Sequence, residues 1–172
     1  IITPISLAST LIFFYLSPFI ITEILKKKKE FFYFKNLLIF GIIFILLLFY
    51  FNYDREYSGG IFYISSKLVF DNNIIFFLIS SLSLLALFLI FVEKKSFKNF
   101  DFLIIIILFL LEIDGVVYHE TYDPLIYILI LALFKNKIIK NFISELNLYK
   151  ITLLFGFLIF FSISSIYRTL IL

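Results

Sequence analysis

The sequence contains no cysteine and no methionine, and glycine, proline, alanine and arginine are scarce among its 172 residues. Without cysteine the chain can form no disulfide bond, no thiolate metal site and no cysteine nucleophile. It has no charged signal-peptide start, and its first residues already belong to an apolar run. We therefore expect a fragment of a longer protein, truncated at its N-terminus.

Apolar residues make up 63% of the chain and the mean hydropathy is +1.12, whereas a soluble domain is nearer ~45–50% apolar. A membrane-spanning helix needs about 20 mostly apolar residues. Six runs reach or approach this length, at residues 1–22, 37–51, 74–92, 102–118, 124–134 and 151–167. The composition therefore predicts an all-α protein with one domain over residues 1–172, a bundle of about six transmembrane helices.

Local features refine three of these runs. Pro18 predicts a kink in the first run, and residues 31–34 extend the second if Lys35 reaches the lipid headgroups. The fifth run has only 11 residues and is too short alone at ~1.5 Å per residue. Small residues in the third and sixth runs predict close approach of helices: Ser80, Ser81, Ser83, Gly156, Ser162, Ser164 and Ser165.

The charges in the five breaks between the runs alternate in sign. Twelve of the 15 Lys and Arg residues border the first, third and fifth breaks, and the other three are Arg55, Lys67 and Arg168. Seven of the 12 acidic residues lie in the second and fourth breaks. Because Lys and Arg in short loops remain on the cytoplasmic side, the pattern predicts six crossings with both termini outside. If the fifth run did not cross, residues 135–150 would lie outside, and the excess of Lys and Arg on the cytoplasmic side would be much smaller. The charge pattern therefore predicts that the fifth run crosses.

Charged residues avoid the middle of every run. Proton pumps and many ion-coupled transporters need such a group deep in the membrane, so a proton-carrying respiratory subunit and a voltage sensor are disfavoured. A transporter is the third choice of function, because it needs a polar site at mid-membrane. The net charge of +3 does not indicate nucleic acid, since the lysines lie beside apolar spans. Membrane lipids are the expected partners.

The fourth break carries the only histidine of the chain and four carboxylates within 12 residues. Histidine beside carboxylates can act as a base or bind phosphate as imidazolium, so His119 and Glu120 are candidate catalytic residues. Clustered carboxylates can also hold a divalent cation. The zinc motif H-E-x-x-H is incomplete, because no second histidine follows Tyr122, and we expect no cofactor. The alternative is a solvated loop in which Asp123 caps a helix that begins at Pro124.

The second break is a polar turn followed by a moderately apolar stretch, residues 61–70. This stretch is expected to lie along the outer interface with its aromatic residues among the headgroups. Arg55 and Lys67 are two of the three outer cations, and are therefore the natural partners for a lipid phosphate. The alternative is a plain connecting loop.

The stretch Tyr118-His119-Glu120-Thr121-Tyr122-Asp123-Pro124 resembles a motif of polytopic glycosyltransferases that use lipid-linked sugars, the GT-C class. Members of that class carry a His and an acidic residue followed by an aromatic residue and a Pro, late in the chain and on the outer face. Here Thr121 stands where those enzymes usually have Arg. Their catalytic base, an acidic residue of the first outer loop, would lie upstream of this fragment.

The resemblance implies transfer of a sugar from a polyprenyl-phosphate carrier to an acceptor outside the cytoplasm. The predicted substrate-binding residues are Arg55, Lys67, Tyr122 and Asp123. The alternative function is a non-catalytic membrane subunit or scaffold of a larger complex. Composition rich in Phe, Ile, Lys and Asn is typical of an AT-rich genome. The expected location is therefore a bacterial inner membrane, with an organellar inner membrane as the alternative.

Overall fold

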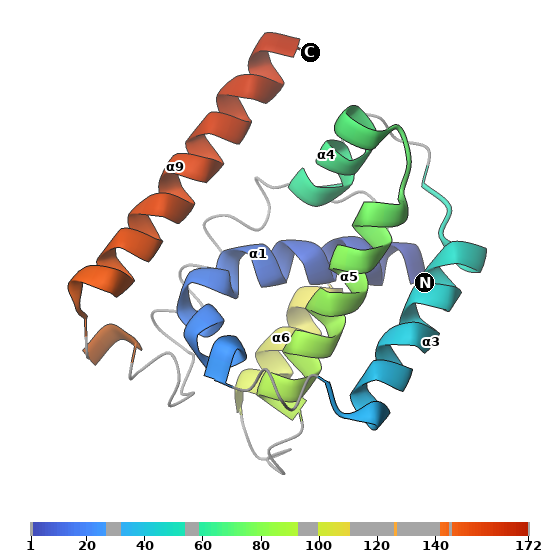
Figure 1. Cartoon of the computed structure of the whole chain (residues 1–172), viewed down its shortest axis with the longest axis horizontal. Coiled ribbons are helices and arrows are strands. Elements are labelled where there is room, and N and C mark those ends of the chain that lie inside the picture. Colours follow the sequence, from blue (N-terminus) through green and yellow to red (C-terminus); the bar gives the residue numbers. More distant parts are fainter. Residues whose placement is uncertain are drawn as a thin grey trace.

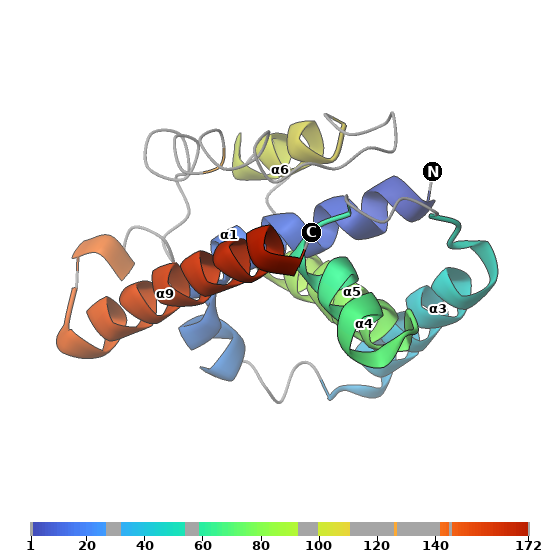
Figure 2. The ribbon, with the colours of Figure 1, turned by 90° about the horizontal axis from the view of Figure 1, so that it is seen from above.

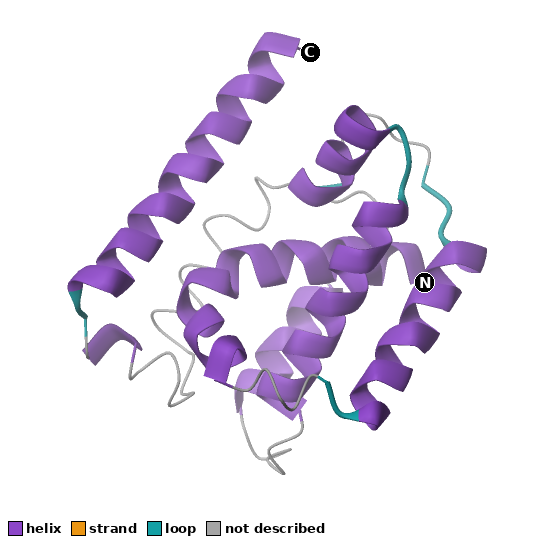
Figure 3. Ribbon diagram, viewed as in Figure 1, coloured by secondary structure: helices purple, strands orange, loops and turns teal. Residues whose placement is uncertain are grey.

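The computed structural model describes residues 2–26, 32–53, 59–92, 100–110, 126, 142–144 and 146–171. Within these ranges the regular structure is entirely helical and includes no strand, as Figure 3 shows. The elements are α1 (Ile2–Lys26), α3 (Phe34–Tyr50), α4 (Ile61–Phe70), α5 (Ile74–Leu87), the π-helical segment η1 (Phe88–Val92), α6 (Phe100–Leu110) and α9 (Leu148–Ile171). The predicted all-α class is confirmed.

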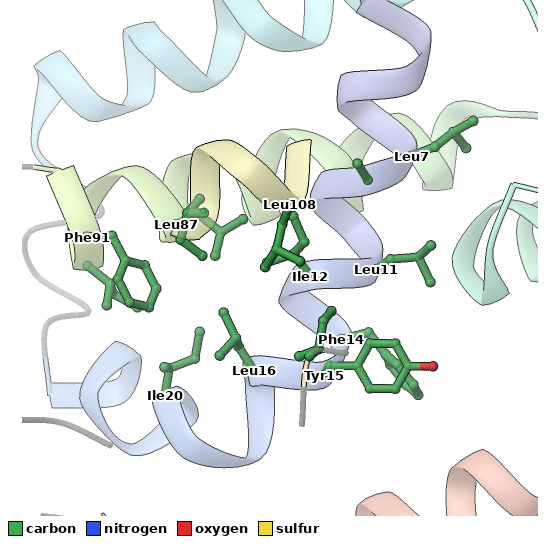
Figure 4. Close-up of a cluster of buried hydrophobic side chains, with 14 of the residues drawn as sticks. Leu7, Leu11, Ile12, Phe14, Tyr15, Leu16, Ile20, Leu87, Phe91 and Leu108 are labelled. Carbon is green, nitrogen blue, oxygen red and sulfur yellow. The ribbon is translucent and has the colours of Figure 1, made fainter. Parts of the chain in front are cut away.

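Helix α1 is the centre of the molecule. In Figure 2 it lies between α6 on one side and α3, α4 and α5 on the other. Seven consecutive residues, 6–12, are buried, which covers the whole circumference of the helix. Figure 4 shows Leu87, Phe91 and Leu108 near Leu16 of this helix. A helix buried on every side belongs to the interior of a bundle.

Pro18 lies inside α1, where the sequence predicted a kink. Proline has no N–H, so the carbonyl of Phe14, four residues earlier, loses its usual helical donor. The Ser17 hydroxyl donates a hydrogen bond of 2.7 Å to this carbonyl oxygen instead. Figure 1 shows α1 changing direction in its second half.

Small polar residues form the contact between α1 and α5. The Ser80 hydroxyl donates to the carbonyl oxygen of Ser6 at 3.3 Å and lies 3.5 Å from the hydroxyl of Ser9. Ser81 and Ser83 are also buried. The predicted role in close helix approach is therefore confirmed for Ser80, whereas the hydroxyls of Ser81 and Ser83 donate to carbonyl groups of α5 itself.

The same prediction is wrong for two residues of α9. No atom of the described residues lies within 4 Å of where a Cβ on Gly156 would lie, and Ser162 is exposed. The side chains of Ser164 and Ser165 lie outside the described part of the structure. Small size alone did not indicate which face of this helix is covered, because its apolar residues are spread over all faces.

The helix boundaries follow the apolar runs. The third run matches α5 and η1 together, and the first, second and sixth runs match α1, α3 and α9. Helix α6 corresponds to the first part of the fourth run. The fifth run lies outside the described residues except for Ile126, which is helical and buried.

Within the described ranges, two helical segments, Ile2–Ile21 and Ile74–Phe91, are long and apolar enough to cross a membrane by length and composition. Two other apolar helical segments, Phe34–Tyr50 and Leu148–Phe160, are shorter. Core helices of soluble proteins can have the same length and composition. The helices therefore provide two candidate spans and do not establish six.

Four helix ends border lysine-rich breaks in the sequence. We call these ends, where α1 and η1 finish and α3 and α9 begin, the lysine-rich end. In Figure 1, α1 finishes and α3 begins toward the bottom of the view, and α9 begins at the left. The rings of Phe19 and Phe142 are 5.2 Å apart, which joins α1 to the residues before α9. At the opposite end the backbone N–H of Asn52 donates to the Thr3 hydroxyl at 3.2 Å.

Candidate functional site

Lys67 is the only predicted site residue that the structure describes. Arg55, His119, Glu120, Tyr122 and Asp123 lie outside the described residues. Lys67 belongs to α4, at the end of the molecule opposite the lysine-rich end. Its surroundings are the residues that join α3, α4 and α5, which we call the outer corner (residues 51–53 and 59–77).

An aromatic cluster connects the three helices of the outer corner. Tyr63 of α4 is completely buried, and its hydroxyl donates to the carbonyl oxygen of Tyr53 at 2.8 Å. Its ring lies 5.1 Å from the Tyr53 ring, 5.5 Å from Phe76 and 5.9 Å from Phe51. Such ring pairs each stabilise a fold by about 0.5–1.5 kcal/mol beyond their buried area. The cluster thus holds α4 against the end of α3 and the start of α5.

Two glycines carry the chain past this cluster. Gly59 and Gly60 have φ values of 105° and 86°, which only glycine adopts without steric cost. A Cβ on Gly59 would lie 2.7 Å from the Tyr63 ring and 2.9 Å from the Tyr53 ring. The entry to α4 therefore requires glycine both for its backbone angle and for the space it leaves.

The turn from α4 to α5 is held by side-chain hydrogen bonds. The Ser66 hydroxyl donates to the carbonyl oxygen of Asn72 at 2.6 Å and accepts from the Phe76 amide at 3.2 Å. Asp71 ends α4 in the left-handed conformation, and its amide donates to the carbonyl oxygen of Lys67 at 2.9 Å. These bonds satisfy backbone groups that helix ends otherwise leave unpaired.

Lys67 is exposed on this fixed support. Its Nζ lies 5.4 Å from the centre of the Tyr63 ring, a distance at which the ring face attracts a cation. As the basic residue in the last turn of α4, it also interacts favourably with the helix dipole. The outer corner therefore presents a positive charge on a rigid backbone, which suits contact with an anionic group.

Among the described residues, Lys150 also lies over an aromatic ring, that of Phe142. Within the same described part of the chain, His, Cys, Asp and Glu never gather in a set of three that could hold a metal ion. The expectation that the aromatic residues of 61–70 lie among the headgroups is wrong for Tyr63, which is buried in the aromatic cluster. The Gly59–Gly60 pair in a chain with only five glycines was a signal that could have indicated it.

Comparison with known proteins adds no relative. No protein-family model, curated protein or solved structure matches the chain. Function must therefore be argued from the polarity of the helix surfaces, from the arrangement of the helix ends and from the sequence motifs.

Proposed function

We propose that this chain is a multi-pass integral membrane protein of a bacterial inner membrane, with six helices that cross the bilayer and both ends outside. An organellar inner membrane is the alternative location. One observation carries the proposal: the described helices expose many large apolar side chains, while a set of small polar side chains is buried beside the apolar core. Exposed apolar surface of this extent is unusual for a soluble protein.

Helix α3 gives the clearest example of this distribution. Its one amide side chain, Asn36, is 4% exposed, while Leu37, Ile42 and Ile45 are each about half exposed. No polar side chain other than Tyr50 occurs between Asn36 and Asn52. An apolar surface this continuous is typical of contact with lipid or with another protein.

The grouping of helix ends supports the proposed orientation. The end of α1 and the start of α3 both lie toward the bottom of Figure 1, and the start of α1 bonds to Asn52 after the end of α3. A chain that crosses a bilayer repeatedly has this arrangement, and the excess of Lys and Arg assigns the lysine-rich end to the cytoplasm.

The absence of cysteine allows a direct test of orientation. In sealed cells, an impermeant thiol reagent should label Ser58→Cys and Thr121→Cys. The same reagent should label Ser96→Cys and Lys137→Cys only after the cells are opened. The reverse pattern would contradict the orientation, and Lys137→Cys labelled from outside would show that the fifth run does not cross.

We further propose that the protein takes part in sugar transfer from a polyprenyl-phosphate donor at the outer face. The support is the sequence motif from His119 to Pro124, together with the exposed cation Lys67 on the outer corner. In this proposal His119 and Glu120 are catalytic, and Arg55, Lys67, Tyr122 and Asp123 bind the substrate.

The activity proposal is tested in the full-length protein by His119→Ala and Glu120→Ala. Loss of general acid–base chemistry should reduce transfer from a polyprenyl-phosphate-linked hexose by about 10²-fold or more, at an unchanged amount of protein in the membrane. Ser144→Ala, at an exposed position before α9, is the matched control. Full function in both variants would favour the scaffold subunit instead.

A further inference from the structure

Exposed tyrosines lie at the ends of α3 and at the start of α9. Tyr33 and Tyr50 flank α3 and are 62% and 66% exposed, and Tyr149 in the first turn of α9 is 58% exposed. Tyrosine is enriched where a bilayer meets water, because its ring is apolar and its hydroxyl is polar. Tyr33 and Tyr149 belong to the lysine-rich end, and Tyr50 to the opposite end.

The spacing of the tyrosines is nearly the same on both helices. Tyr33 and Tyr50 are 17 residues apart, which corresponds to about 26 Å along a helix. Tyr167 lies within α9, 18 residues after Tyr149, which corresponds to about 27 Å. The hydrocarbon core of a typical bilayer is about 30 Å thick, and thinner membranes occur.

The exposed surface between the tyrosines of α3 is aliphatic. Its most exposed members are Leu37, Leu38, Ile42, Ile45, Leu46 and Leu48. The exposed aromatic residues of this segment lie at its two ends: Phe32, Tyr33, Phe34, Phe49 and Tyr50. The exposed surface of α3 is therefore aromatic at both ends and aliphatic between them. A bilayer likewise has a headgroup region on each side of its hydrocarbon core.

Lysine accompanies the level of Tyr33 and Tyr149 on both helices, whereas the other level has one adjacent cation in the sequence, Arg168 after Tyr167. Lys35 is exposed two residues after Tyr33. Lys150 follows Tyr149, with its Nζ 5.3 Å from the centre of the Phe142 ring and 3.4 Å from the carbonyl oxygen of Phe142. Cations at this level complement the anionic headgroups of the cytoplasmic leaflet.

We infer that α3 and α9 contact the acyl chains of a bilayer whose hydrocarbon thickness is about 26 Å, with the tyrosines at its two headgroup levels. The inference rests on the proposed membrane location and adds the lipid-contacting faces and their depth. Figures 1 and 2 place α3 and α9 on opposite sides of the molecule. A bilayer surrounds both sides, whereas one protein partner would cover only one.

The chain contains no tryptophan, so single substitutions give clean depth reporters. The reporters are Tyr33→Trp, Tyr50→Trp and Tyr149→Trp at the proposed headgroup levels, with Ile42→Trp and Ile45→Trp at mid-helix. The full chain is reconstituted in vesicles of phosphatidylcholine and phosphatidylglycerol that carry bromine at shallow or deep acyl positions. Quenching of tryptophan emission then reports the depth of each side chain.

Deep bromines should remove most of the emission of Ile42→Trp and Ile45→Trp, whereas shallow bromines should quench the three tyrosine replacements best. Two mid-helix reporters keep the test decisive if one variant fails to fold. If the protein floats with the vesicles but neither mid-helix reporter is quenched by lipid, a second copy or another protein covers α3. In that case the inferred lipid contact is wrong, and the proposed membrane location is not affected. If the protein does not float with the vesicles, the proposed membrane location fails as well.

Discussion

Gly59 and Tyr63 show how individual residues determine the position of α4. Tyr63 needs a partner for its buried hydroxyl and receives it from the carbonyl group of Tyr53. The chain can reach this arrangement only by passing close to both rings at Gly59, with a positive φ. Gly59 thus provides the backbone angle, and Tyr63 provides the contact that requires this angle.

Gly59→Ala should therefore destabilise the protein by about 1–3 kcal/mol, because its Cβ would meet two buried rings in a strained backbone conformation. Thermal unfolding in detergent, followed by circular dichroism, should show a lower midpoint. Gly41→Ala is the matched control: Gly41 is helical with no atom within 4 Å of a Cβ, so the change should be neutral or stabilising. Equal effects of the two substitutions would refute the role assigned to Gly59.

At the scale of elements, the α1–α5 contact depends on small side chains. Ser80 and Ser9 are both fully buried and their hydroxyls are 3.5 Å apart, so no space remains for a larger group. In a membrane, helices associate through such close packing and hydrogen bonds rather than through the hydrophobic effect. This contact joins the two candidate spans of the chain.

Ser80→Leu should separate α1 from α5 and cost about 1–3 kcal/mol through overpacking. The same substitution at Ser162, which is exposed on α9, should be tolerated. Unfolding midpoints of the two variants in detergent would be compared with that of the unchanged chain. A larger loss at Ser162 would indicate that α9 packs against a further protein surface.

Sequence reasoning predicted the helices better than their faces. The run 74–92 is uninterrupted and apolar, so its length was sufficient to predict α5 and η1. Ser80 and Ser162 could not be distinguished, because both lie in runs that are apolar on all sides. Only the tertiary arrangement separates them. For the same reason, the role of residues 61–70 as a helix over an aromatic cluster required the structure.

For the molecule as a whole, the charge pattern carried the most predictive information. It predicted six crossings and their orientation, and this topology stays a prediction, since the described helices provide two candidate spans. The charge pattern does not predict the chemistry of residues 112–124, because that chemistry depends on side-chain positions that charge alternation does not specify. Lys67 was predicted as an outer cation from charge alone, whereas the ring beneath it follows from contacts between distant parts of the chain.

Helix α1 also has a consequence for biosynthesis. It carries four described hydroxyl groups that donate to carbonyl groups three residues earlier in the same helix, those of Ser6, Ser9, Thr10 and Ser17. A polar group in hydrocarbon is costly unless it has a hydrogen-bond partner. Because these partners are internal, the proposed membrane location predicts that α1 is stable in lipid before α5 has been synthesised.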